Sequence, residues 1–358
     1  LGAFIGTFMY CLLVLRSVRG VEEIRFVPHL AVTVAIVLAV GCMGALIYFI
    51  HHISQGIQAA QVIANVGTEF DEAVARLFPQ KIGGGPHETA GVDENRAGED
   101  IPADFEQNSR PVASQSGGYV QIVNGDGLMK LAVENGCILQ LLHPPGAMVM
   151  EDDALARIWP RERATEEMEK AINAAFSFGM QRTSAQDALF PIDQLTEIAV
   201  RALSPGINDP FTAMMCLDRQ GRALALLAKR KIPSGLRYDD EGQLRVITPT
   251  LSFGQATDAA FDPIRHYSSS AAVSGYLLQI IARLAPHLRR EADRAALRRH
   301  AAQTLQASRS GLTLDFEIRA VEERHTAAIH ALNERESQSH EQKSDESTKH
   351  DITLEEAR

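Results

Sequence analysis

A tight turn between two predicted helices carries the densest set of polar and turn-forming residues in the sequence. It spans residues 204–210 and reads SPGINDP, with Pro and Gly at the central positions that a type II turn requires. Asp209 followed by Pro210 is typical of a helix N-cap and the first helical residue. Because a helix N-terminus offers unpaired N–H groups and about half a positive charge, the turn could bind a small anion such as a phosphate or a lipid headgroup.

Residues near this turn, and one histidine farther along the chain, complete the candidate ligand-binding site. The set is Arg182, Asp187, Arg201, Ser204, Gly206, Asn208, Asp209, Thr212 and His266. The arginines supply positive charge and Thr212 adds a hydroxyl group in the first turn of the second helix. A histidine is the side chain best suited to titrate near neutral pH, which gives His266 its place in the set.

The same residues also have structural interpretations, and these stay open. The turn residues can serve only in turning and capping, and Asp209 at the cap would itself repel an anion. Ser184 followed by Asp187 reads as a capping box, and a single histidine is more often hydrogen-bonded within a fold. Six arginines between residues 283 and 299 either face anionic headgroups or form a solvated helix face.

Standard catalytic and metal-binding motifs do not occur in the sequence. There is no GxSxG, Walker A or GxGxxG motif, and the 12 histidines show no HxH or HExxH spacing. The 4 cysteines form no CxxC pair, which excludes a zinc knuckle and a dithiol redox site. We therefore expect no cofactor and no metal. A net charge of −10 argues against nucleic acid as a partner.

The first fifty residues are apolar enough to lie in a membrane. Residues 30–50 are 21 residues without a charge, and a bilayer span needs about 20. Residues 1–15 form a second uncharged run that already starts on an apolar residue, so we expect a chain cut inside a transmembrane helix. Residues 16–25 would join the two as an antiparallel hairpin. Three arginines in this loop favour a cytoplasmic loop and an external soluble domain.

The rest of the chain divides by composition and periodicity. We expect a membrane hairpin at 1–52 as part of a larger transmembrane bundle, an amphipathic stalk helix at 53–79, a flexible insert at 80–117, a small β-barrel or sandwich module at 118–160, an α-helical domain at 161–331 and a disordered charged tail at 332–358. The fold class is thus a membrane helical hairpin with a soluble α+β region. The apolar stripe of the stalk either packs on its own domain or forms a coiled coil between protomers.

Four separated stretches of the chain share the pattern of one protein family. They are residues 6–20, residues 26–53, the pair Gln186-Asp187 and, most specifically, ALSPGINDPFTA at 202–213. On these stretches the sequence resembles the bacterial multipass membrane proteins catalogued as domain of unknown function 2254. The resemblance implies further transmembrane helices upstream and a cytoplasmic soluble part, against the loop charges. It implies no particular activity. The family's PGxFVxxGxPL turn is altered here, where Glu151, Asp152 and Asp153 replace the glycine.

Together these features predict an integral protein of the bacterial inner membrane. We expect a non-enzymatic transport, channel or sensing role, in which the soluble domain responds to a ligand or partner. The alternatives are a membrane-tethered enzyme acting on an anionic small molecule or lipid headgroup, and an oligomeric membrane scaffold. The enzyme would require Asp187 and His266 in one cleft. The expected partners are the lipid bilayer, a small anionic ligand and further copies of the chain, through its transmembrane and stalk helices.

Overall fold

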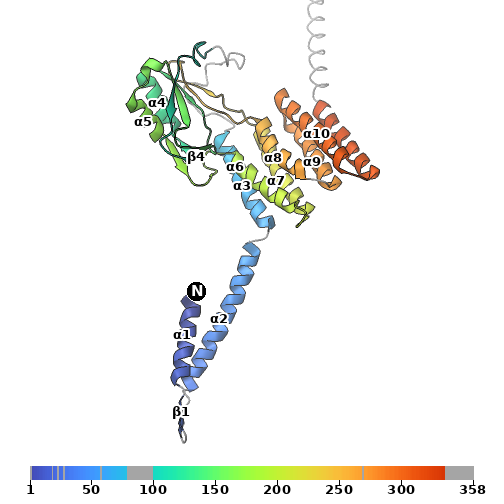
Figure 1. The fold of residues 1–358 in the computed structure, drawn as a ribbon. Coiled ribbons are helices and arrows are strands. Elements are labelled where there is room, and N and C mark those ends of the chain that lie inside the picture. Colours follow the sequence, from blue (N-terminus) through green and yellow to red (C-terminus); the bar gives the residue numbers. More distant parts are fainter. Residues whose placement is uncertain are drawn as a thin grey trace, which may run out of the picture. The chain divides into compact units, whose positions relative to one another are not determined.

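The computed structural model describes residues 2–17, 19–21, 24–26, 29–56, 59–78, 100–267 and 270–334. The chain divides into two units, Leu1–Val62 and Ile63–Arg358, and each is described by itself. Figure 1 shows the helices and strands of both, coloured along the sequence.

The first unit is a pair of apolar helices joined by a short β-ribbon. Its elements are α1 (Gly2–Ser17), β1 (Arg19–Val21), β2 (Ile24–Phe26) and α2 (His29–Gly56). The two strands pair antiparallel, so the connection that the sequence predicts as a loop is a two-stranded ribbon. The Tyr10 hydroxyl donates to the Ala31 carbonyl oxygen, and Thr7 Oγ1 lies 3.2 Å from Cys42 Sγ. These contacts tie the antiparallel helices together.

Length distinguishes the two apolar helices. The 20 residues His29–Tyr48 of α2 are long and apolar enough to cross a bilayer, whereas α1 is shorter. Large apolar side chains stand on the outside of both, including Leu30 at 83% exposed and Leu15 at 69%. Such a surface suits lipid better than water. Among the described residues, α2 is therefore the helix that meets the length expected of a span.

The helix that follows in sequence belongs to the core of the second unit. It is α3 (Ala59–Leu77), and its apolar stripe places Ile63, Phe70 and Val74 among the fully buried side chains. They pack with residues of the helices that follow much later in the chain. The structure thus packs the amphipathic stripe on its own domain.

The later helices that supply the other side chains of this apolar core are labelled in Figure 1. The helices are α6 (Leu189–Ala202), α7 (Pro210–Ala228), α8 (Phe253–Tyr267), α9 (Ala271–Leu284) and α10 (Glu291–Gly311), with the short η3 (Ala285–His287) and a helical segment at 315–334. Apolar residues at steps of three and four, such as Leu195, Ala199 and Ala202 on α6, explain the burial of one face of each helix. Inside the core, Gln220 donates to Thr196 Oγ1 at 2.8 Å, which satisfies part of its buried amide.

Two open sheets form the β part of the second unit. The five-stranded sheet has the order β3 (Arg110–Ala113), β7 (Ala154–Trp159), β5 (Ile138–Leu141), β10 (Leu244–Ile247), β9 (Leu236–Tyr238). The three-stranded sheet has the order β6 (Met148–Val149), β4 (Gly118–Val123), β8 (Phe176–Gly179). Strands β5 and β10 pair parallel, and the other described neighbours pair antiparallel.

Two helices cover these sheets and share one apolar core with them. They are α4 (Gly125–Asn135) and α5 (Glu166–Ala174), and the short η2 (Arg161–Arg163) lies between β7 and α5. Leu128 of α4, Leu139 of β5 and Ile172 of α5 are fully buried in this core. The N-terminus of α4 is capped by Asn124, whose side chain accepts from the N–H of Gly127.

Several expectations about this region need correction. Neither sheet closes, so residues 118–160 are not a self-contained barrel or sandwich. Strands from 110–113, 176–179, 236–238 and 244–247 complete the sheets, which also places three strands inside the range 161–331 predicted to be an α-helical domain. Strand pairing between remote segments leaves no local signal, which is why the period-2 pattern missed it.

The predicted insert at 80–117 is also folded where the structure describes it. Residues 100–117 contain β3, and Phe105 is 4% exposed because it packs with Leu236 and Leu244. Tyr238 adds a hydrogen bond to Asp100 at 2.7 Å. One aromatic anchor thus fixes a segment whose composition predicts disorder. Residues 80–99 of the predicted insert and 335–358 of the predicted tail lie outside the described residues, and residues 332–334 are helical.

Candidate functional site

A cavity of about 320 Å³ opens at the carboxyl ends of the parallel strands β5 and β10. His143 follows β5 and Thr248 follows β10, and both line it together with Gly125 and Asp126 from the first turn of α4. In α/β proteins, ligands commonly bind where the carboxyl ends of parallel strands meet a helix N-terminus. The topology therefore makes this cavity the leading candidate for a ligand-binding pocket.

Arg237 of β9 is the cationic group of the pocket. No acidic side chain among the described residues pairs with it, and burial alone lowers the pKa of its guanidinium. Two neighbours of Arg237 in the sheet do have acidic partners. Arg245 Nε lies 2.7 Å from Asp239, and the Tyr238 hydroxyl donates to Asp100. Burying a guanidinium without a counter-charge costs free energy that a bound anion would recover. The charge of Arg237 therefore favours an anionic group in the pocket.

The remaining lining of the pocket is apolar with a few polar groups. Met129, Leu141 and Val246 supply apolar walls. His143 Nε2 lies 3.0 Å from the Ala154 carbonyl oxygen, and this contact orients the ring. Asp126, an exposed residue, also lines the pocket, and its negative charge would repel a second negative charge on a ligand. Apolar walls with few convergent polar groups are typical of small-molecule sites.

A buried ion pair supports one wall of the pocket. Asp187 is 4% exposed and lies 2.7 Å from Arg182 Nη2, and its carboxylate also accepts from the N–H groups of Leu189 and Phe190 at the start of α6. Burial raises the pKa of Asp187, against the opposing effect of the Arg182 hydrogen bonds. Arg182 Nη1 binds a second carboxylate, Asp193, at 2.5 Å. Residues 182–193 are therefore held together by one guanidinium group, which binds the carboxylates of both Asp187 and Asp193.

The wall itself is formed by the turn after β5 and by Gln186. Gly146 has φ +90°, and a Cβ atom there would lie 2.0 Å from Asp187 Oδ2, so the turn packs directly on the buried carboxylate. The next residue of this turn toward β5, Pro145, lines the pocket. Gln186 also lines it and binds both the N–H and the carbonyl oxygen of Val123, at 2.8 and 3.2 Å. Residues 186–187 thus connect the pocket to α6.

The structure brings together only some of the residues predicted for the ligand site. Arg182 and Asp187 form the pair just described. Arg201 pairs with Glu197 on the surface of α6, and Ser204 Oγ donates to the Arg201 carbonyl oxygen. Within the described residues, no hydrogen bond or ion pair joins the Arg182–Asp187 pair to the 204–212 turn. His266 is exposed in the last turn of α8.

The 204–212 turn itself is occupied by capping contacts. The Asp209 carboxylate accepts from the N–H groups of Phe211 and Thr212 and from the Thr212 hydroxyl, and these hydrogen bonds, the hydroxyl first, lower the pKa of Asp209. The predicted N-cap with Pro at the first helical position is therefore confirmed. The type II turn is wrong, because Asn208 rather than Gly206 adopts the left-handed conformation, with φ +48°. This arrangement favours the structural interpretation of the turn.

Sequence reasoning missed the pocket residues, Arg237 above all. An arginine in a three-residue strand carries no local sign that it lacks a counter-ion, since that depends on which elements pack around it. The parallel pairing of β5 with β10 is likewise invisible in the sequence. The sequence signal that pointed nearest to the pocket was the Gln186-Asp187 pair.

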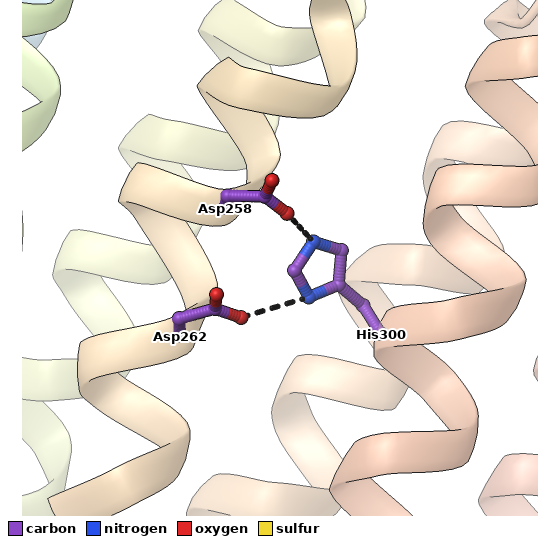
Figure 2. A group of neighbouring side chains, drawn as sticks. All are labelled: Asp258, Asp262 and His300. Carbon is purple, nitrogen blue, oxygen red and sulfur yellow. Dashed lines mark hydrogen bonds and ion pairs between the residues drawn. The ribbon is translucent and has the colours of Figure 1, made fainter.

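A separate cluster contains the residue types of a metal site. On α8, Asp258 and Asp262 flank His300 of α10, whose side chain is fully buried (Figure 2). Figure 2 shows each ring nitrogen facing a different carboxylate. Nε2 lies 2.9 Å from Asp258 Oδ1, and Nδ1 lies 3.4 Å from Asp262 Oδ1. Arg299 pairs with Asp258, and Arg265 lies 2.7 Å from Asp262 and 3.2 Å from His300 Nδ1. Two guanidinium groups thus balance the two carboxylates, which describes an ion-pair network joining two helices.

The buried imidazole of this network gives a pH-dependent contribution to stability. Burial lowers the pKa of His300 below 6.5, with Asp262 and Asp258 acting against burial and the arginines with it. The unfolded chain therefore takes up the proton first, and the free energy of unfolding should fall as the pH drops below about 6.5. Thermal unfolding followed by circular dichroism between pH 8 and pH 5 measures this.

His300→Gln is the comparison that isolates the effect, because glutamine keeps a donor near Asp258 but does not titrate. We expect the stability difference between the two proteins to narrow as the pH falls through 6.5. Parallel pH profiles for wild type and variant would rule out a lowered pKa at His300. The shifts of other buried groups cancel in this difference.

The comparisons with known proteins identify the family. The family described as a predicted membrane protein, domain of unknown function 2254, matches residues 1–283. The chain belongs to this family. The match contains α1, α2, both sheets and the pocket at the ends of β5 and β10. The identification agrees with the resemblance carried by residues 6–20, 26–53 and 202–213.

Curated relatives in mycobacteria extend the match. Uncharacterized proteins of Mycobacterium bovis and of Mycobacterium tuberculosis are each 29% identical over 288 residues, covering 79% of this chain and 53% of each relative. The chain therefore spans about half the length of these relatives. No solved structure matches the chain significantly. Membership of this family of predicted membrane proteins supports the lipid bilayer as the environment of the N-terminal apolar helices.

Proposed function

We propose that this protein is a membrane-anchored sensor whose pocket at the carboxyl ends of β5 and β10 binds a small amphipathic monocarboxylate. The observation that carries the proposal is Arg237, a half-buried guanidinium in a cavity without an acidic partner among the described residues. A carboxylate matches the planar donors of arginine in two parallel hydrogen bonds. The sequence predicted a soluble domain that responds to a ligand, and the proposal adds the location of the binding site and the chemical class of the ligand.

The shape and charge of the pocket support this class of ligand. Met129, Leu141 and Val246 would contact an apolar body, and a volume of about 320 Å³ suits a small molecule. The Asp126 carboxylate disfavours a dianion because it would face the second charge. An apolar acid with one negative charge satisfies both the cation and the walls.

The coupling from the pocket to the helices runs through two consecutive residues. Gln186 lines the pocket and holds the end of β4. Asp187 receives the N–H groups at the start of α6 and packs on Gly146 of the pocket turn. A ligand that moves this turn would therefore act on the first turn of α6. This physical connection favours sensing over a passive scaffold.

The proposal includes a place in the cell. We infer a multipass protein of the bacterial inner membrane, with a cytoplasmic soluble part and with self-association through its transmembrane helices. The family membership and the long apolar α2 support a membrane location. The enzyme alternative has weaker support, because Asp187 is engaged by Arg182 and by backbone donors while His266 is exposed.

Arg237→Gln tests the proposal directly. In isothermal titrations of the full chain in uncharged detergent, wild type should bind butanoate or hexanoate but not butanamide. The variant should bind the acids at least about tenfold more weakly, since a hydrogen bond to a charged group contributes about 1.5–3 kcal/mol. Succinate should bind more weakly than butanoate because of Asp126.

Arg110→Gln is the matched control, because it removes an arginine from the same sheet outside the pocket. Arg110 is 51% exposed and pairs with Glu169. We expect its affinity for butanoate to stay within about twofold of wild type. The proposal fails if neither acid binds, or if both variants bind as wild type does.

A further inference from the structure

A second, larger cavity lies in the helical part of the second unit and is lined by basic residues. Its volume is about 550 Å³, and it sits where the end of α7 meets the first turns of α8 and α10. Five basic side chains line it: Lys229, Arg230, Lys231, Arg289 and Arg290. The acidic residue in the lining, Asp293, is already bound to Arg290 Nε at 2.8 Å. The cavity therefore carries a strong excess of positive charge.

Two nitrogen atoms of this basic lining are buried and unsatisfied. Arg230 Nε and Arg290 Nη2 have no hydrogen-bond partner within the part of the chain that the structure describes. Buried donors of a charged group are normally paired, because leaving one unpaired costs about 1–3 kcal/mol or more. Both belong to side chains that line the same cavity. An anion in the cavity would place negative charge beside these two guanidinium groups.

The helix ends add backbone donors to the same cavity. Ser252 and Gln255 form a capping box at α8, which occupies the N–H groups of those two residues. The N–H groups of Phe253 and Gly254 stand in the first helical turn, where no intrahelical acceptor exists, and both residues line the cavity. The start of α10 has no side-chain cap. The first turn of α8 contains no acidic residue, so its N-terminus adds partial positive charge to the five basic side chains, whereas the first turn of α10 carries Glu291 and Asp293.

The same positive field affects a nearby histidine. Burial, and then the charge of Lys229, lower the pKa of His287 in η3. This agrees with the surplus of basic side chains that line the cavity.

We propose that this basic cavity binds a phosphate group. A phosphate carries up to two charges and several acceptor oxygens, which suits five cations and the N-terminus of α8 better than a single carboxylate would. The group can belong to a free phosphate compound or to the headgroup of a lipid such as phosphatidic acid. This site is distinct from the carboxylate pocket in residues, ligand class and position in the fold.

The test uses the full chain in uncharged detergent and three probes. These are inorganic phosphate, pyrophosphate and the soluble short-chain lipid dihexanoyl phosphatidic acid, each titrated calorimetrically at a low and at a high ionic strength. We expect at least one to bind, with affinity that falls as salt rises. The double variant Lys231→Gln/Arg289→Gln changes two exposed lining residues and should weaken binding at least tenfold without unfolding the protein.

The double variant Arg201→Gln/Arg319→Gln is the charge-matched control, because it removes two exposed arginines that do not line the cavity. Its affinities should stay within twofold of wild type. Binding of phosphate or pyrophosphate alone supports a free phosphate compound, and tighter binding of the lipid supports a headgroup. The proposal is overturned if no probe binds, or if both double variants lose affinity equally. Neither outcome of the phosphate titrations bears on the binding of butanoate at Arg237, which is tested separately.

Discussion

Replacing Asp187 with alanine is expected to lower the free energy of unfolding by about 3–5 kcal/mol, because it removes one partner of a buried ion pair. The Asp187 carboxylate is 4% exposed and accepts from Arg182 and from the N–H groups of Leu189 and Phe190. Alanine would leave these donors without their acceptor at the start of α6. Urea unfolding of the full chain in detergent, followed by circular dichroism, measures the loss.

Asp193→Ala is the matched control for this substitution, since Asp193 binds the same guanidinium from the solvent side. Its side chain is 42% exposed and its Oδ2 lies 2.5 Å from Arg182 Nη1. We expect a cost of no more than about 1 kcal/mol, as for other partly exposed ion pairs. Equal losses from the two substitutions would show that burial does not set the strength of the Asp187 contact.

Gly146→Ala is expected to destabilise the protein by more than about 3 kcal/mol, since it combines backbone strain with a steric clash. Gly146 has φ +90°, and the new Cβ would lie 2.0 Å from Asp187 Oδ2. The carboxylate cannot move away without weakening its bond to Arg182. Because the same turn carries Pro145 into the pocket, butanoate binding should also weaken.

Gly136→Ala separates the two causes of this effect. Gly136 ends α4 with φ +56°, but a Cβ there would meet open space. We expect only the cost of the left-handed conformation, about 1–2 kcal/mol. Thermal unfolding followed by circular dichroism measures the stability of the Gly146→Ala and Gly136→Ala variants. If the two alanine variants lose the same stability, the contact between Gly146 and Asp187 is not what constrains the turn.

The sequence predicted those parts of the fold whose instructions are local. The helix–turn–helix around Asp209 and Pro210 is an example, because capping residues act on N–H groups within three positions. The apolar run in α2 is another, since length and the absence of charge decide whether a helix can span a bilayer. Both follow from neighbouring residues alone.

The sheets could not be predicted in the same way. Strand β10 pairs with β5 in parallel, and β3 pairs with β7, across long stretches of intervening chain. Short strands with mixed polarity fit several registers, so the choice is made by the shared core around residues such as Leu139 and Val246. Phe105 shows the same effect, because one buried aromatic ring orders a polar segment.

The candidate sites illustrate the difference most clearly for arginine. Arg237 and Arg245 lie on adjacent strands, yet one has no acidic partner among the described residues and the other binds Asp239. Nothing in the residues beside them distinguishes the two. Sequence reasoning instead selected the 204–212 turn, where the Asp209 carboxylate already accepts from the N–H groups of Phe211 and Thr212 and from the Thr212 hydroxyl. Whether a charge is available for a ligand is decided by tertiary packing.

The packing of α3 determines how the protein can be divided for biochemical work. Ile63, Phe70 and Val74 fill the interior formed by the later helices. A fragment that begins at β3 would therefore lack these side chains and expose an apolar cavity. A water-soluble version therefore has to begin ahead of Ile63 and omit only α1 and α2. Such a boundary would keep both proposed binding cavities on a polypeptide that lacks the apolar helices α1 and α2.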